Sequence, residues 1–203
     1  MTAIRPYRAD DLDALYRICL ATGDAGADAA TLYRDPRLVG HVYAAPYGVL
    51  SPDTAFVVED DDGVGGYIVG PADTHAFEQR LEREWWPRLR ASYPDPPRVV
   101  NADDRMAHLI HHPETTPARI WQAYPAHLHI NLLPRLRRRG FGKRLLETWL
   151  APVAAQGAHA AHLGVGVRNT GAIAFYISCG FREIEREDDG ATIVFGIETR
   201  SSG

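Results

Sequence analysis

Apolar residues recur at helical and strand spacing most clearly in the last eighty residues of the chain. One set recurs every three or four positions, as in an amphipathic helix: Phe141, Leu145, Leu146, Trp149, Leu150 and Val153. Over this part, the pattern predicts in chain order a strand at 127–133, a helix at 140–156, a strand at 160–167, a helix at 170–179, and a hairpin of strands 181–187 and 191–198. Asp189-Gly190 supplies the predicted hairpin turn.

The first part of the chain alternates short strands with helices. Its pattern predicts a strand at 3–8, a loop at 23–52 with one or two short helices, strands at 55–59 and 64–69, and helices at 73–90 and 103–112. Asp10 or Asp11 is expected to cap a first helix, and Asp73 is expected to cap the helix that begins there. The acidic turn at 60–63 is interpreted as a solvated hairpin tip.

The order of strands and helices indicates an α/β fold with a mixed sheet. The chain has 203 residues, which fits a single domain over 1–203. The connection at 71–125 is too long for bare coil, so we expect a helical insertion there.

Composition narrows the function classes. The net charge is -4, which argues against general nucleic-acid binding. Two cysteines are too few for a disulfide framework, and no apolar run has the length of a membrane span. The first residues lack the apolar stretch of a secretory signal, so we expect a cytoplasmic protein without membrane partners.

One segment departs from this acidic average. Residues 135–144 hold six cations and no acid: Arg135, Arg137, Arg138, Arg139, Lys143 and Arg144. They lie between a predicted strand and a predicted helix, whose unpaired N–H groups favour phosphate. Gly140 and Gly142 remove side chains where a ligand backbone contact is expected. The spacing matches neither a Walker loop nor a dinucleotide fingerprint. A nucleic-acid patch is the non-enzymatic alternative for this segment.

Two motifs in this region resemble those of the GNAT superfamily of acyl-CoA-dependent acetyltransferases. The pattern [Q/R]-x-x-G-x-[G/A] is matched by residues 137–142, and N-x-x-A-x-x-x-Y-x-x-x-G-F by residues 169–181. The amino-terminal part, with residues 37–40 and the predicted helix around residues 85–87, is also similar to the acetyltransferase-like domain that follows the hydrolase in O-GlcNAcases. Free-standing bacterial members of that group have the more similar organisation.

The resemblance implies a GNAT fold: a mixed central sheet of about seven strands flanked by helices, with two parallel strands that splay apart near Leu132 and Val167. It implies acetyl-CoA as co-substrate, with a free N–H near Leu132 facing the thioester oxygen. The implied cofactor-binding residues are Leu132, Leu133, Arg137, Arg138, Arg139, Gly140, Phe141, Gly142, Lys143, Asn169, Phe175 and Tyr176.

By the same resemblance, the protein is an N-acetyltransferase in which an amine attacks the acetyl group directly. Tyr176 is the expected proton donor to the leaving thiolate. His129, Asp73 or a chain of water molecules would accept the proton of the amine. A polar strand position for His129 and a helix cap for Asp73 are the structural alternatives.

Other functions stay open at this point. The acceptor is an unidentified small molecule or protein, and a homodimer is compatible with the resemblance. The alternative function is a catalytically weak or inactive acetyl-CoA-binding or protein-interaction module. His108, His111 and His112 share a predicted helical face that could bind zinc, but no HExxH-type pattern completes it, and we expect no metal.

Overall fold

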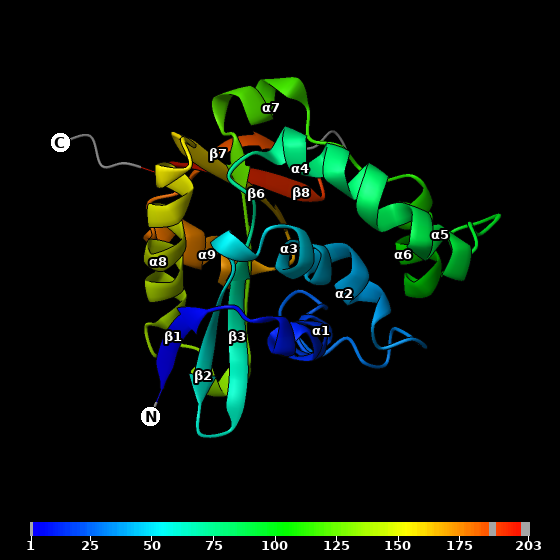
Figure 1. Ribbon diagram of the computed structural model, residues 1–203, viewed down its shortest axis with the longest axis horizontal. Helices are drawn as coiled ribbons and strands as arrows, with labels where there is room; N and C mark the ends of the chain where they lie inside the picture. Colours follow the sequence, from blue (N-terminus) through cyan, green and yellow to red (C-terminus); the bar gives the residue numbers. More distant parts are fainter. Residues whose placement is uncertain (1, 187–189, 200–203) are drawn as a thin grey trace.

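The computed structural model describes residues 2–186 and 190–199, whose strands form two sheets (Figure 1). The first sheet is antiparallel throughout and has the strand order β1 (Ala3–Pro6), β2 (Phe56–Asp60), β3 (Gly63–Val69), β5 (His129–Leu132). The second sheet has the order β4 (Ala126–His127), β6 (Ala160–Gly166), β8 (Thr192–Glu198), β7 (Arg182–Arg186). The mixed α/β fold class is thereby confirmed.

The predicted strand at 127–133 is divided between the two sheets. β4 pairs in parallel with β6 through Ala126 and His127, whereas β5 pairs antiparallel with β3. The two strands are separated by Leu128 alone, which is buried. Taken together, β4, Leu128 and β5 correspond to the single strand that the sequence predicts at 127–133. β6 pairs with β4 only at Ala161 and His162 and continues to Gly166, whereas β5 belongs to the other sheet, so β5 and β6 diverge after Leu128.

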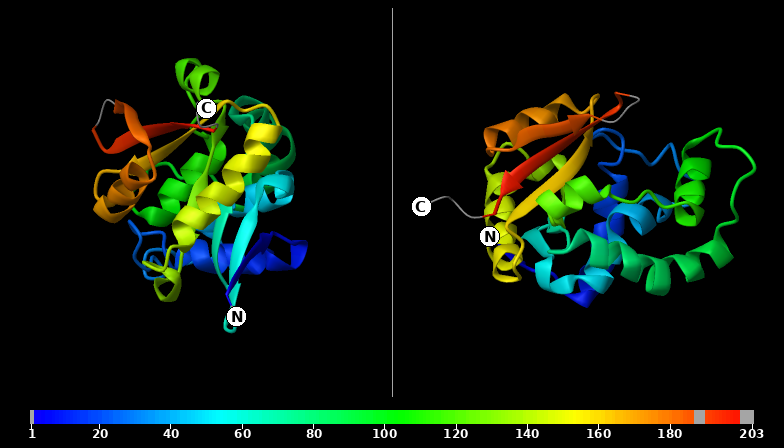
Figure 2. Two further views of the ribbon diagram at one scale, coloured as in Figure 1. Left: turned by 90° about the vertical axis from the view of Figure 1, so that its left-hand side faces the viewer. Right: turned by 90° about the horizontal axis from the view of Figure 1, so that it is seen from above.

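Helices cover both faces of the first sheet. On one face, Tyr67 and Val69 pack in a cluster with residues of α1 (Leu12–Leu20), α2 (Leu38–Tyr43) and α3 (Ala45–Leu50). On the other, Val58 and Ile68 pack against α8 (Phe141–Ala155), whose Trp149 is fully buried. Figures 1 and 2 show α8 on the opposite side of the sheet from α1. The alternating side-chain directions of a strand produce this arrangement.

The segment at 71–125 contains helices at both predicted positions and one further helix, at 118–123, that the sequence did not predict. α4 (Thr74–Arg80) continues through a π-helical turn (Leu81–Trp85) into α5 (Trp86–Ser92), and α6 (Ala102–His111) and α7 (Ala118–Ala123) follow. Asp73 caps α4 as predicted, because its carboxylate accepts the Ala76 N–H at 2.9 Å. Figure 1 shows α5 and α6 at the end of the molecule away from α8.

Two predictions for acidic residues are corrected. Asp11 stands at the start of α1, after a 3-10 turn (Ala9–Asp11), but does not cap it; its carboxylate binds Arg5 and the Arg8 N–H instead. Asp60 is not simply a solvated residue of a hairpin tip, since both of its carboxylate oxygens accept hydrogen bonds from Arg135, at 2.9 and 3.0 Å.

The remaining short elements are 3-10 turns at Pro52–Thr54 and Pro134–Leu136, and α9 (Thr170–Ser178) between the second-sheet strands β6 and β7. The predicted hairpin of the last strands is present as β7 and β8. Its Asp189 lies outside the described residues. Within the described ranges, no helix combines the length and apolar character that a membrane crossing requires.

Candidate active site

The start of α8 has the features of an anion site. Gly140 precedes the helix with a φ of 81°, in the left-handed region that glycine adopts without strain, and none of the described side chains caps this end. The first N–H groups of a helix have no partner within it, so those of Phe141, Gly142 and Lys143 are left to bind a ligand. The helix dipole adds partial positive charge at the same place.

The two glycines of this loop differ in what surrounds them. A Cβ atom at Gly140 would have no heavy atom of residues 2–186 or 190–199 within 4 Å, so this side of the loop is open with respect to them. A Cβ atom at Gly142 would lie 3.0 Å from Cε2 of Phe175. Gly142 therefore lets α8 approach α9 closely, whereas the prediction gave both glycines a role in approaching the ligand.

The six cations of residues 135–144 are divided between two kinds of environment. Arg135 is ion-paired with Asp60, and Arg137 donates to backbone oxygens of Leu132 at 2.8 Å and Gly26 at 2.7 Å. The other four side chains flank the start of α8 and, like Arg137, are exposed: Arg138, Arg139, Lys143 and Arg144. Among them, Arg139 donates to the Arg135 backbone oxygen at 3.2 Å. Arg138 has a φ of 56°, an uncommon conformation for a residue with a side chain.

β5 presents one edge that pairs with no strand of the described chain. Leu133 donates its N–H to the Gly65 oxygen of β3 at 2.8 Å. Hydrogen-bonding direction alternates along an antiparallel strand, so the N–H groups of Ile130 and Leu132 point away from β3. We call these groups the outer edge of β5. The Leu133 N–H is thus occupied, and the Leu132 oxygen accepts from Arg137.

Tyr176 and Phe175 lie on α9. The Tyr176 ring is buried against Phe181, with centroids 5.4 Å apart, and burial raises its pKa above the ordinary tyrosine value. The phenol is therefore protonated at neutral pH. Asn169 begins α9 as its cap, because its side-chain oxygen accepts the Ala172 N–H at 3.1 Å. A Cβ at Gly26 would lie 3.9 Å from that oxygen, so the Gly26 loop lies beside both Asn169 and Arg137.

His129 lies at the start of β5 and is partly exposed. Its Nε2 is 3.0 Å from the hydroxyl of Tyr47, which is also 3.0 Å from Nε2 of His127. Burial lowers the pKa of His129 to about 4, with a smaller contribution from His162. His129 is therefore neutral at pH 7. Tyr47 had no place in the sequence prediction: it lies in the segment read as loop, 82 residues from His129, with no local motif.

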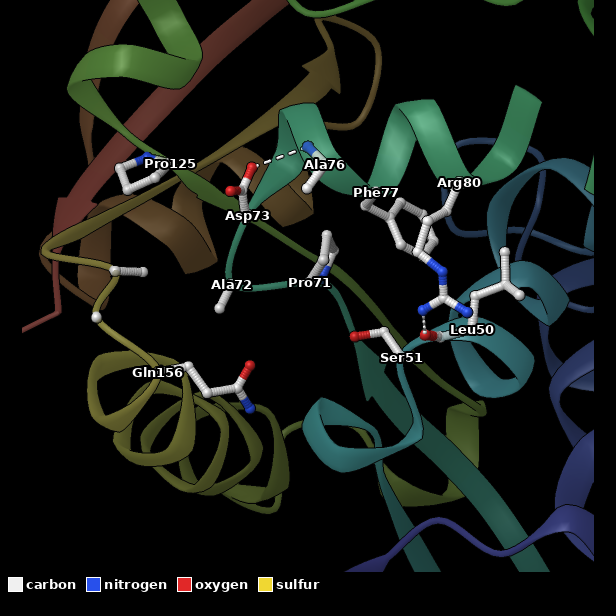
Figure 3. Close-up of a pocket in the computed structure, with 12 residues that line it drawn as sticks. Leu50, Ser51, Pro71, Ala72, Asp73, Ala76, Phe77, Arg80, Pro125 and Gln156 are labelled. Carbon is white, nitrogen blue, oxygen red and sulfur yellow. Dashed lines mark hydrogen bonds between the residues drawn. The ribbon is translucent and has the colours of Figure 1, made fainter. Parts of the chain in front are cut away.

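Asp73 lies away from the start of α8. It lines a surface pocket of about 340 Å³ with Ser51, Ala72 and Gln156, and Figure 3 shows Gln156 and Asp73 on opposite sides of it. Gln156 follows the last residue of α8, and a helix of 15 residues is about 22 Å long. The structure therefore brings Asp73 to the opposite end of α8 from the exposed cations.

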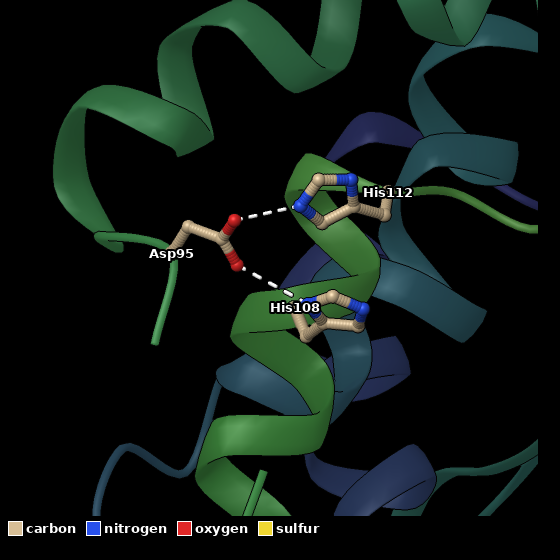
Figure 4. A group of neighbouring side chains, drawn as sticks. All are labelled: Asp95, His108 and His112. Atoms are coloured by element: carbon tan, nitrogen blue, oxygen red, sulfur yellow. Dashed lines mark hydrogen bonds and ion pairs between the residues drawn. The ribbon is translucent and has the colours of Figure 1, made fainter. Parts of the chain in front are cut away.

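The predicted histidine face of α6 is only partly formed. His108 and His112 both contact the carboxylate of Asp95, at 3.2 and 2.6 Å, as Figure 4 shows, whereas His111 contacts the Tyr93 oxygen at 2.7 Å. Asp95, which the sequence did not single out, replaces His111 in the group. The three side chains connect the segment before α6 to the carboxyl-terminal end of that helix.

Comparison with known proteins identifies the family. Residues 4–181 match the model of the acetyltransferase (GNAT) family. The crystal structure of SsHAT is 40% identical, with a TM-score of 0.92 over 98% of this chain and 99% of that chain. The structure of yncA from Salmonella typhimurium, with its cofactor acetyl-CoA, shares the fold at a TM-score of 0.57 and 14% identity over 98% of this chain and 94% of that one.

A curated relative is much longer than this chain. Protein O-GlcNAcase of Rattus norvegicus is 25% identical over 186 residues, which are 90% of this chain and 20% of that protein. This chain therefore spans about a fifth of the relative's length. The family match confirms what the two motifs indicate, and the chain belongs to the acetyltransferase (GNAT) family.

Proposed function

We propose that the protein transfers an acetyl group from acetyl-CoA to an amine by direct attack of the amine. The observation that carries the proposal is the start of α8, which follows β5 after the 3-10 turn Pro134–Leu136 and is flanked in the sequence by four exposed cations. A diphosphate fits such a helix start through backbone N–H groups and arginine side chains.

The chemistry of the loop fits the phosphate end of acetyl-CoA. The open side of Gly140 leaves room for phosphate oxygens, and Arg138, Arg139 and Lys143 can each add a charge-assisted hydrogen bond. The outer edge of β5 offers the N–H groups of Ile130 and Leu132 to an extended amide chain, in the way that a strand adds to a sheet. An N–H of this edge can donate to a thioester oxygen.

Bound acetyl-CoA would supply a thioester: the amine nitrogen forms a bond to the acetyl carbon, and the bond from that carbon to sulfur breaks. Tyr176 is assigned as the proton donor to the departing sulfur, because burial keeps its phenol protonated. His129 is assigned to accept the proton of the amine, because it is the first residue of β5, directly after the point at which β4 and β5 separate. We assign Asp73 its cap role alone.

The test is an assay of thiol release from acetyl-CoA with a panel of amines: small primary amines, peptides with a free amino terminus, lysine peptides and aminoglycosides. The expected result is release with at least one class. Tyr176→Phe should lower kcat by roughly 10²-fold or more and leave acetyl-CoA affinity unchanged in calorimetry. Tyr33→Phe, on the other side of the first sheet, is the matched control.

Each outcome separates the two candidate functions. Acetyl-CoA binding without release for any amine would contradict catalysis and favour the binding module. Release that is unchanged in Tyr176→Phe would remove Tyr176 from the mechanism while leaving the acetyltransferase function in place.

A further inference from the structure

Four side chains from four different elements form one hydrogen-bonded chain behind β5. Thr74 begins α4, His127 lies on β4, Tyr47 on α3 and His129 on β5. The Thr74 hydroxyl oxygen is 2.9 Å from Nδ1 of His127, and the Tyr47 hydroxyl links Nε2 of His127 to Nε2 of His129. The chain ends at a backbone carbonyl, because the Thr74 hydroxyl lies 2.7 Å from the Pro125 oxygen.

The proton positions in this chain can be deduced from its fixed end. A carbonyl oxygen only accepts, so Thr74 gives its single hydroxyl proton to Pro125. Nδ1 of His127 must then carry a proton and donate it to Thr74. Burial lowers the pKa of His127 well below the ordinary histidine value, so the ring is neutral and its Nε2 is bare.

The proton position on His127 also determines the tautomer of His129. The bare Nε2 of His127 accepts from the Tyr47 hydroxyl, which thereby uses its only proton. Tyr47 can then only accept from His129, so Nε2 of His129 carries the proton of that neutral ring. The lone pair of His129 is left on Nδ1, for which the described residues provide no hydrogen-bond partner.

The surroundings keep this arrangement neutral. The titratable side chains that act electrostatically on His129 and Tyr47 are His162, Tyr43 and Glu78. His162 is buried, and its Nδ1 lies 2.7 Å from the Tyr124 backbone oxygen. It makes no hydrogen bond to another histidine of the described residues. Glu78 accepts the Thr116 N–H at 2.9 Å. No carboxylate of the described chain is hydrogen-bonded to either ring of the His127–His129 pair.

We propose that Thr74, His127 and Tyr47 are positioning residues that hold the proton of His129 on Nε2, so that Nδ1 presents a bare lone pair to an N–H of the acceptor amine. The inference rests on the proposed function. As the bond from nitrogen to the acetyl carbon forms and the carbon–sulfur bond breaks, the amine proton passes by way of Nδ1 to solvent. The sulfur takes the proton of Tyr176, which solvent replaces.

The proposal defines the acceptor by its chemistry. A bare ring nitrogen receives an N–H and cannot donate to a carbonyl or carboxylate oxygen of the acceptor. The site therefore accepts a primary or secondary amine that has a free N–H, and it offers nothing to a tertiary amine.

The test combines nitrogen NMR with kinetics. The ring nitrogens of His129 are observed in protein with ¹⁵N-labelled histidine and assigned by comparison with His129→Asn. The population of the tautomer protonated at Nε2 should exceed that of the tautomer protonated at Nδ1 roughly tenfold. Tyr47→Phe keeps the ring that stacks on Phe77 but removes the hydroxyl. We expect the proton to move toward Nδ1, because Nε2 loses its acceptor, and kcat/KM for the amine to fall about tenfold. Acetyl-CoA affinity should stay unchanged.

Tyr43→Phe is the matched control, because the Tyr43 ring lies beside His129 but its hydroxyl makes no hydrogen bond to a histidine of the described chain. It should change neither the tautomer nor kcat/KM. His129→Asn places an oxygen near the position of Nδ1 and should keep more activity than His129→Leu.

The outcomes distinguish this inference from the proposed function. A proton on Nδ1 in the wild-type protein, or the same tautomer ratio in Tyr47→Phe, would overturn the inference whether or not the enzyme turns over. Full activity of His129→Leu would also overturn it. If no amine is acetylated, the proposed function fails. The NMR result still decides whether Thr74, His127 and Tyr47 hold the proton of His129 on Nε2.

Discussion

Arg5 shows how one residue joins separate elements. Its guanidinium donates to both oxygens of Asp11, at 2.7 and 2.8 Å, and to Glu59 on β2 at 2.6 Å. Asp11 also accepts the Arg8 N–H at 2.8 Å. These bonds connect β1, β2 and the start of α1. The hydrogen bonds from Arg5 hold the pKa of Asp11 below its usual range.

Asp11→Asn should therefore lower the free energy of unfolding at neutral pH by about 2 kcal/mol, since Asp11 is buried and its bonds are charge-assisted. A carboxyl with a depressed folded pKa stabilises the fold above its unfolded pKa and loses that contribution as pH falls through the folded value. The difference between variant and wild type should shrink as pH falls below about 4. Urea unfolding of the variant and the wild type across this pH range measures the difference in free energy of unfolding. Asp10→Asn, at an exposed position, is the control. A difference that does not depend on pH would contradict the ion-pair explanation.

At the scale of single residues, sequence reasoning identified positions better than partners. Asp73 and Asn169 occupy the cap positions that their residue types favour, because a cap depends on neighbours three residues away. The Tyr47–His129 contact and the bond from Asn131 to Thr22 join residues far apart in the chain. No local pattern encodes such pairs, so the hydrogen-bonded chain behind β5 could not be predicted.

At the scale of elements, periodicity predicted the helices and strands but not the division at Leu128. The residues from His127 to Leu132 form one apolar-polar alternation, and only their pairing with two different strands separates β4 from β5. The same limit applies to the cation cluster. Composition could not tell that Arg135 pairs with Asp60 of the hairpin between β2 and β3, whereas Lys143 is exposed.

This division of the cations predicts two opposite phenotypes. Arg135→Gln should lower the melting temperature, because it breaks the contact with β2, and leave acetyl-CoA affinity unchanged. Lys143→Gln should leave the melting temperature unchanged, because Lys143 is 68% exposed, and weaken acetyl-CoA binding roughly threefold to tenfold. The weakening should diminish at high salt, where exposed charges are screened. If both variants weaken binding equally, Arg135 belongs to the phosphate site after all.

At the scale of the whole molecule, the two sheets diverge where the chain passes from β4 to β5, and α8 starts after the 3-10 turn that follows β5. This order places the exposed cations at the end of the diverging strands. The sequence predicted this order, because the motifs at 137–142 and 169–181 have the order and separation typical of the GNAT family. The helices α4, α5 and α6 were predicted as helices and α7 was not; the positions of α4 to α6 depend on packing in one cluster with α2 and α3, which no motif describes.

The central claim is that the start of α8 binds the phosphates of acetyl-CoA, and calorimetric titration of acetyl-CoA into Gly140→Asn and Gly140→Asp tests it most directly. Both side chains occupy the open space at Gly140 and impose similar backbone strain, but only Asp adds a negative charge beside the helix start. We predict saturable 1:1 binding to the wild-type protein and at least roughly tenfold weaker binding to Gly140→Asp than to Gly140→Asn. A flat wild-type titration, or equal affinities of the two variants, would contradict the account.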